Sequence, residues 1–400
     1  MKMKNLPKGW EIKKLGEVAK IIMGQSPSSD TYTEDINCIP FFQGKAEFTE
    51  LYPVVKKYCT RPTKIAEPFD VLLSVRAPVG TTNIANQKCC IGRGLSAIRF
   101  ENYKYGFYFL RSIQQELDNK GTGTTFRAIS GEIIRETLLP YPPLETQQRI
   151  VTKIEELFSE LDKGVEELKK TQEQLKTYRQ SVLKWAFEGR FTNQNVKDGE
   201  LPDGWEWKKI CEISKVVRGG SPRPAGDPKF YDGNIPFLKV ADLTRDNGIY
   251  LTTYNYTIKE AGLHKTRQIS PNTLLLTNSG ATLGVPKICM IHATMNDGVA
   301  AFLDLDERSN HYMYYFWLSK TLELRGINMG AGQPNLNTDL IKEYKVPYCT
   351  FEEQHQIVQE IESRLSVADK LEEQIKTSLQ QAEALRQSIL KKAFEGELVR

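Results

Sequence analysis

Two stretches of the chain show the spacing of apolar side chains, three or four residues apart, that is typical of a long amphipathic helix. The first follows the proline-rich segment at 140–143 and ends at Glu188-Gly189, and the second follows Pro347 and ends at Glu395-Gly396. Apolar residues at this spacing form one stripe along a helix, and a glycine after the last helical residue is a common helix end. The pattern predicts two helices of about 40 residues, each about 60 Å long.

A helix with a single apolar stripe needs a surface that covers the stripe. We expect the two helices to pack against each other as an antiparallel coiled coil, because a globular segment separates them along the chain. The alternative is that each helix packs only on the globular segment of its own half.

The segments outside the helices contain short β-rich runs, such as 70–75 and 273–277, which are separated by Gly, Pro and Asn. Short helices are expected at 107–117 and 312–322. The predicted fold class is therefore α+β, with two compact α/β domains that are joined by the two long helices.

The chain also contains an internal repeat. The segment LPKGWEIKKLGEVAKII, from Leu6, returns as LPDGWEWKKICEISKVV from Leu201, a shift of 195 residues. The shift is 204 at Gly94 and Gly298, and it stays at 207 from Gln147 to the end of the helices. Twelve inserted residues thus fall within the globular segment of the second half and none in its helix. We expect a pseudo-two-fold molecule whose domains diverge while its helices keep one length.

The repeat and the helix pattern predict four parts along the chain: a domain at 1–144, a spacer helix at 145–190, a linker and second domain at 191–350, and a second spacer helix at 351–400. The net charge is +6 over residues 1–144 and +2 over 201–350, against −1 over 145–200 and −3 over 351–400. A basic domain is typical of a protein that binds a polyanion. A solvated basic surface is the alternative.

Cysteine and histidine usage argues against a disulfide framework and a metal site. The seven cysteines form an odd set without a C-x-x-C pair, and the four histidines are scattered. No segment approaches the roughly 18 apolar residues of a membrane span, and the first residues lack the apolar core of a secretory signal. We expect a cytoplasmic protein with reduced thiols and no membrane partner.

Motifs for covalent chemistry are missing from the sequence. The chain has no Gly-x-x-x-x-Gly-Lys-Ser/Thr loop, and Tyr141-Pro142-Pro143 lacks the flanking residues of an amino-methyltransferase loop. No Ser-His-Asp or Cys-His arrangement is indicated. We therefore expect no catalytic residues and no cofactor.

Basic and amide side chains on predicted loops are the remaining candidates for function, because Arg, Lys, Gln and Asn bind base edges and phosphates. Each of them could instead be a solvated surface residue or a turn former. The candidate DNA-contacting residues of the first half are Gln43, Lys45, Arg76, Lys88, Arg93, Thr124 and Thr125. Those of the second half are Arg218, Arg223, Lys239, Asn278, Lys287, Gln333 and Asn335.

The sequence resembles the specificity subunit of type I restriction–modification systems over nearly its whole length. The strings that carry the likeness are LPKGWEIKKLGEV, GQSPSS, DVLLSVRAPVG, GRGLSAIRF, GTGTTFRAIS and LPYPPLETQQRIVTKIEELFSELD. The second half supplies LPDGWEWKKICEIS, GGSPRP and VPYCTFEEQHQIVQEIESRLS, but has LTNSG at 276–280 in place of the SVRAP string.

The resemblance implies a non-catalytic subunit with two target-recognition domains, each of which reads one half of a split site in double-stranded DNA. It implies that the paired helices act as a spacer and dock two modification (methyltransferase) subunits, with restriction/translocase subunits joining later. The candidate partner-binding residues are Gln147, Ile150, Ile154, Gln354, Ile357 and Ile361.

Two other functions are compatible with parts of the pattern. One is a coiled-coil scaffold whose end domains bind protein, against which the basic domains and the family strings argue. The other is a fused enzyme, against which the missing motifs argue. The salt dependence of binding would help to separate these classes, because contacts to phosphates weaken steeply as ionic strength rises.

Overall fold

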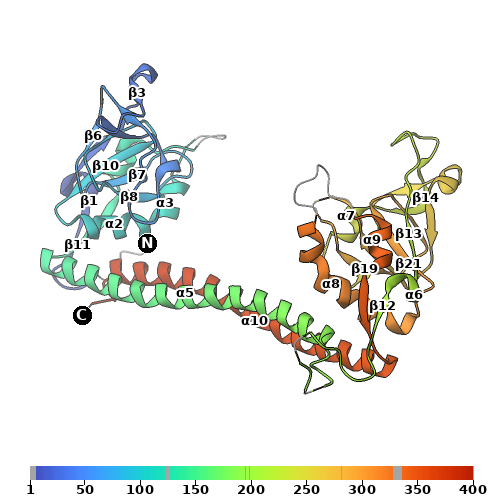
Figure 1. The fold of residues 1–400 in the computed structure, drawn as a ribbon. Helices are drawn as coiled ribbons and strands as arrows, with labels where there is room; N and C mark the ends of the chain where they lie inside the picture. The colour runs from blue at the N-terminus through green and yellow to red at the C-terminus, as the bar shows by residue number, and fades with distance from the viewer. Residues whose placement is uncertain are drawn as a thin grey trace. The chain divides into compact units, whose positions relative to one another are not determined.

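The computed structural model describes residues 6–122, 127–193, 195–197, 199–280, 282–327 and 336–399. The chain divides into two compact units (Figure 1), of which unit 1 comprises Met1–Lys169 and Ile375–Arg400 and unit 2 comprises Lys170–Gln374. Each unit contains a globular domain and part of each long helix. We call the globular part of unit 1, up to residue 143, domain 1, and that of unit 2, residues 188–350, domain 2.

The two long helices are present at the predicted places. Helix α5 runs over Leu144–Phe187 and helix α10 over Phe351–Phe394, 44 residues each. Both end at a glycine with positive φ, Gly189 at 74° and Gly396 at 78°. After each glycine the next backbone N–H donates to a carbonyl five residues back, the C-terminal cap that glycine permits. The prediction of glycine-terminated helices is confirmed.

Domain 1 is built on two sheets. The first is antiparallel, in the order β2-β10-β7-β8, and the second has the order β3-β5-β4-β9-β6 with β4 parallel to β9. The strands of the first are β2 (Ala19–Met23), β7 (Val71–Ser74), β8 (Thr82–Ile84) and β10 (Leu95–Phe100). Those of the second are β3 (Tyr32–Thr33), β4 (Ile39–Phe42), β5 (Tyr58–Cys59), β6 (Ile65–Ala66) and β9 (Cys89–Ile91).

Short helices and a two-stranded ribbon complete domain 1. The helices are α1 (Leu15–Val18), α2 (Tyr103–Ser112), α3 (Gln114–Asn119) and α4 (Gly131–Arg135), and the ribbon pairs β1 (Glu11–Lys14) with β11 (Leu138–Tyr141). The single helix that the sequence predicts over 107–117 is divided into α2 and α3. The backbone of buried Ile113, with φ −107° and ψ 13°, leaves the helical conformation and separates them.

Domain 2 repeats this plan. Its sheets have the orders β13-β21-β18-β19-β15 and β16-β14-β20-β17, and its ribbon pairs β12 (Glu206–Lys209) with β22 (Lys345–Tyr348). The sheet strands are β13 (Lys215–Arg218), β14 (Tyr231–Leu238), β15 (Tyr250–Leu251), β16 (Thr257–Ile258), β17 (Arg267–Ile269), β18 (Thr273–Thr277), β19 (Pro286–Cys289), β20 (Ala293–Met295) and β21 (Val299–Leu303). The α-helices are α6 (Ile210–Ile213), α7 (Val240–Leu243), α8 (Asn310–Ile327) and α9 (Thr338–Glu343).

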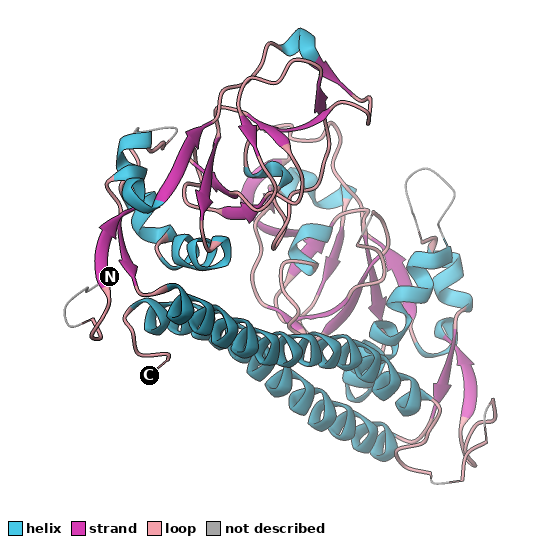
Figure 2. Cartoon of the chain, turned by 90° about the vertical axis from the view of Figure 1, so that its left-hand side faces the viewer, coloured by secondary structure: helices cyan, strands magenta, loops and turns pink. Residues whose placement is uncertain are grey.

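Each domain packs on both long helices, as Figures 1 and 2 show for each unit separately. The core of unit 1 joins the first turns of α5, at Ile150 and Ile154, to Phe394 at the end of α10. The core of unit 2 joins Ile357 and Ile361 of α10 to the end of α5 in the same way. The start of one helix thus shares a core with the end of the other. The predicted antiparallel pairing is confirmed, and packing on a helix's own domain occurs together with it.

Equivalent ion pairs join the two helices inside each unit. Arg179 lies 2.6 Å from Asp369 and 2.9 Å from Glu372 in unit 2, and Arg386 pairs with Asp162 in unit 1. The two Arg–Asp pairs are related by the 207-residue repeat. In the part of the chain that the structure describes, no helix has the length and apolar character that crossing a lipid bilayer requires.

Candidate nucleic-acid interface

Loops that follow β2, β4 and β9 meet at one end of domain 1. A Cβ on Gly24, after β2, would lie closer than 3.0 Å to the carbonyl oxygen of Gly92, and one on Gly94 equally close to that of Gln43. Such close approach of two backbones requires glycine. We define the loop face of domain 1 as the loops 24–28, 43–45 and 92–94 with the adjoining Arg76.

Four of the candidate residues lie exposed on this loop face: Gln43, Lys45, Arg76 and Arg93. The backbone N–H of Arg93 donates to Ser26 Oγ at 3.2 Å, which fixes the turn, while the Arg93 side chain is exposed to solvent. The N–H of Val75 donates to the carbonyl of Gly94. The backbone next to Arg76 is thus hydrogen-bonded to the backbone next to Arg93, and both exposed cations are accessible to a polyanion.

Other candidates of the first half do not join this group. Lys88 lies at the opposite end of β9, where its ammonium is 3.7 Å from a carboxylate oxygen of Glu67. Thr124 and Thr125, as well as Gln333 and Asn335 of the second half, fall outside the described residues.

Domain 2 forms an equivalent loop face from 219–223, 239–241 and 296–298, with the adjoining Arg218. A Cβ on Gly219 would again lie closer than 3.0 Å to a carbonyl oxygen, that of Asn296. Arg218 and Arg223 are exposed here, and Lys239 is half-buried with its ammonium 3.6 Å from the centre of the Tyr256 ring. The lysine is held by a cation–π contact and remains partly open to solvent.

Asn278 and Lys287, in contrast, lie inside domain 2. Asn278 is fully buried, and its N–H donates to Gly298 as that of Val75 does to Gly94, so it occupies the position of Val75. Neither its amide oxygen nor its amide nitrogen has a hydrogen-bond partner among the residues that the structure describes. Both residues are buried and lie outside the loop face of domain 2.

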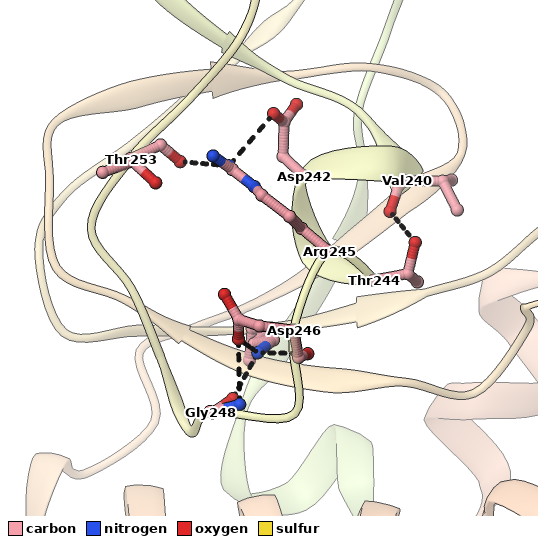
Figure 3. A network of polar contacts seen from close by, with 8 residues as sticks. Val240, Asp242, Thr244, Arg245, Asp246, Gly248 and Thr253 are labelled. Carbon is pink, nitrogen blue, oxygen red and sulfur yellow. Dashed lines mark hydrogen bonds and ion pairs between the residues drawn. The ribbon is translucent and has the colours of Figure 1, made fainter. Parts of the chain in front are cut away.

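Lys287 holds a loop in place. Its buried ammonium donates to the carboxylate of Asp246 at 2.7 Å, to the carbonyl of Asp246 at 3.0 Å and to the carbonyl of Gly248. The hydrogen bond from the Lys287 ammonium to the Asp246 carboxylate is the main reason why the pKa of Asp246 lies below its ordinary value. Figure 3 shows the same loop fixed at a second point, where Arg245 donates to Asp242 and to the carbonyl of Thr253.

All six candidate partner-binding residues are buried within their own unit. Ile150, Ile154, Ile357 and Ile361 are at most 1% exposed and belong to the domain cores. The side-chain amides of Gln147 and Gln354 donate to the carbonyls of Pro142 and Cys349, just before each helix. These residues join helix to domain, and a partner would have to use other positions.

Asp297 is a loop-face residue that the sequence reasoning missed. Its carboxylate accepts a hydrogen bond from Ser221 Oγ at 2.5 Å and lies 3.7 Å from the Arg223 guanidinium, and its carbonyl accepts from Arg218 Nε at 2.6 Å. The match of Gly94 with Gly298 could have revealed it, because the preceding residues of that match are Arg93 and Asp297.

The described residues include no group of three His, Cys, Asp or Glu side chains that could hold a metal ion. The seven cysteines form no disulfide. The loop faces offer exposed hydrogen-bonding and cationic side chains, which suit recognition of a polyanion.

Comparison with known proteins places these features in a family. The model of the type I restriction modification DNA specificity domain matches residues 7–173 and 202–381, one copy in each half. The EcoBI specificity subunit of Escherichia coli is 27% identical over 357 residues, which cover 83% of this chain and 74% of that protein. A Methanocaldococcus jannaschii protein provisionally named the MjaX specificity subunit is 37% identical over 191 residues, 46% of this chain and 44% of that one.

Structural comparison agrees about the fold. A chain of a solved type I restriction–modification system, studied for its assembly and conformational transition, superimposes with a TM-score of 0.75 at 22% identity and covers 98% of this chain and 99% of that one. The family model covers most of the sequence, and its two matches coincide with the two halves of the repeat. This chain belongs to the family of DNA specificity subunits of type I restriction–modification systems.

Proposed function

We propose that this chain reads a bipartite site in double-stranded DNA, with residues 1–144 recognising one half and residues 191–350 the other. The observation that carries the proposal is that one loop face is built twice with different side chains. The close backbone approach of Gly24 to Gly92 returns between Gly219 and Asn296, and the hydrogen bond that the Gly94 carbonyl accepts returns at the Gly298 carbonyl, whereas the exposed cations differ. Two related surfaces with different polar groups suit two different base sequences.

In this proposal the helices at 145–190 and 351–400 are spacers. Helices α5 and α10, which form these spacers, are both 44 residues long, and the ends of both helices are packed into the domain cores. A fixed separation between two reading domains implies a fixed gap between two half-sites, by the geometric relation that governs dimeric DNA-binding proteins.

We propose further that two modification subunits dock on the chain, that restriction/translocase subunits join them, and that the complex works in the cytoplasm. Methyl transfer and cleavage belong to these partners. The family membership and the bipartite plan support this assignment. Since Gln147 and Ile150 and their repeat equivalents are buried, docking would use the solvent-exposed positions of α5 and α10.

Modified-base sequencing of the host genome with and without this gene tests the proposal. We expect deletion to abolish a methylated motif that consists of two short halves around a fixed gap, and a plasmid copy to restore it. An unchanged methylome in a strain whose modification subunits are expressed would contradict the proposal. That result would favour the alternative, a coiled-coil scaffold with protein-binding end domains.

A further inference from the structure

The two loop faces carry opposite charges at one equivalent position. Arg93 and Asp297 precede Gly94 and Gly298, and each lies against the serine of a Gly-x-Ser-Pro loop. Ser26 Oγ accepts from the Arg93 N–H, and Ser221 Oγ donates to the Asp297 carboxylate. The backbone frame is preserved, while the side chain at its tip changes from a cation to an anion.

The side chains next to this position change in the opposite sense, from neutral in domain 1 to cationic in domain 2. Arg218 and Arg223 flank Asp297, at the positions that Met23 and Ser28 occupy in domain 1. Domain 1 therefore presents Arg93 from the turn after β9, whereas domain 2 presents Arg218 from the end of β13 and Arg223 from the loop that follows β13. The arginines at this part of the loop face thus come from different elements in the two domains.

Asp297 contacts both arginines of domain 2. Its carbonyl accepts from Arg218 Nε, and its carboxylate lies 3.7 Å from Arg223, whose side chain is 71% exposed. The carboxylate is itself anchored by Ser221. Because an arginine reads a base through a planar fork of donors, its orientation decides what it can bind.

We propose that Asp297 is a positioning residue that aims Arg218 and Arg223 at the half-site of domain 2, and that Arg93 contacts the half-site of domain 1 directly. This inference rests on the proposed function. Arginine donates a bidentate pair to O6 and N7 of guanine. Because the arginines stand at different positions on equivalent backbones, the two domains bind different bases.

The test uses the full chain assembled with its own modification subunits. Methylation is measured by modified-base sequencing on a library in which each base of the site is varied. We expect Asp297→Asn, Arg218→Ala and Arg223→Ala each to lower discrimination at one or more bases of a single half-site, by about tenfold for the arginines. Discrimination in the other half should stay within about twofold. Arg93→Ala should affect the opposite half.

Two further variants separate positioning from folding. Ser221→Ala removes the anchor of the carboxylate without touching an arginine, and we expect it to weaken the same half-site as Asp297→Asn. Glu206→Gln is the matched control, because Glu206 pairs with Lys208 on the β12–β22 ribbon, and it should change neither half. Thermal unfolding of each variant establishes that the domain is folded.

The outcomes distinguish the two claims. A bipartite wild-type motif whose halves are both unchanged in every folded variant would overturn this inference and leave the proposed function standing. Equal loss of both halves in folded Asp297→Asn would overturn it as well. A wild-type complex that methylates no bipartite motif would overturn the proposed function, and this inference with it.

Discussion

At the scale of single residues, one position shows how the repeat keeps a structural role while it changes the chemistry. Lys287 of β19 lies opposite Leu275, as Asn83 of β8 lies opposite Leu72. Asn83 is fully buried and exchanges hydrogen bonds with the backbone of Thr49. Each side chain therefore holds a loop against its sheet. The amide of Asn83 binds the backbone of Thr49 in domain 1, and the ammonium of Lys287 binds Asp246 in domain 2.

The ion pair between Lys287 and Asp246 predicts that the stability of the fold depends on pH. The pKa of Asp246 is lowered from 3.8 by Lys287, so the ion pair stabilises the fold above that pH, and the stabilisation is lost as the pH falls through the lowered pKa. We expect Asp246→Asn to unfold at a lower denaturant concentration than the wild type at pH 6, with the difference shrinking below about pH 3.8. A difference that grows on acidification would contradict the assignment.

Replacement by alanine is expected to have opposite effects on stability at two glycines. Gly164 lies inside α5 with open space around the site of its Cβ, so Gly164→Ala should stabilise unit 1 by about 0.5–1 kcal/mol. Gly189 has φ 74°, and its Cβ would meet Pro202, so Gly189→Ala should destabilise unit 2 by at least about 1 kcal/mol. Differential scanning calorimetry measures both, and shifts of the same sign would refute this account.

At the scale of elements, the pairing of the long helices has a charged component beside its apolar stripe. Arg386 is the more buried of the two equivalent arginines, with 16% of its side chain exposed against 28% for Arg179. Its guanidinium also lies over the Phe158 ring, 5.1 Å from the ring centre. Equivalent ion pairs at one spacing favour a single register of the two helices.

Charge reversal tests this contribution. Arg386→Asp and Asp162→Arg should each destabilise unit 1, and the double variant should recover part of the loss, because the attractive pair returns with its charges exchanged. A coupling of about 0.5–1 kcal/mol is expected for a pair whose carboxylate is 52% exposed, measured by denaturant unfolding. The same charge reversal of Lys176 and Glu173, a pair within α5, is the control, because this pair does not join the two helices. Strictly additive effects of the Arg386 and Asp162 substitutions would contradict the proposed contribution to register.

Patterns that are local in sequence predicted these elements well. The apolar spacing and the Glu-Gly ends defined α5 and α10, and the conserved 207-residue shift implied their equivalence. The interior positions of Asn278 and Lys287 were not predictable in this way. Their polarity suggested a surface. Only the hydrogen bond of the Asn278 N–H to Gly298 shows that Asn278 replaces Val75, and only the strand register shows that Lys287 replaces Asn83. Burial of Gln147 and Ile150 likewise depends on how the helix meets its domain.

At the scale of the whole molecule, each unit combines parts of both halves. The core of unit 1 includes the end of α10, and that of unit 2 includes the end of α5. The exchanged residues are repeat equivalents: Val182, Leu183, Ala186 and Phe187 correspond to Ile389, Leu390, Ala393 and Phe394. The end of α5 from a second copy of the first half can therefore supply the apolar residues that the core of domain 1 takes from the end of α10.

A fragment that ends at Gly199 tests this exchange. We expect two such fragments to associate, since each leaves the apolar end of its helix uncovered, and we expect the dimer to read a palindromic site in which the half-site of domain 1 occurs twice. Analytical ultracentrifugation measures the association. A folded fragment that remains monomeric at micromolar concentration would show that the exchanged core is dispensable.

The most direct test of the central claim, two reading domains held apart by a helical spacer, is to lengthen the spacer. One heptad inserted after Thr171 and one after Ser378, the equivalent position, keeps the apolar stripe and adds about 10 Å to each helix. Modified-base sequencing of cells that carry this variant should show both half-sites unchanged and the gap between them longer by about three base pairs. An active variant that methylates the site with the original gap would contradict the account.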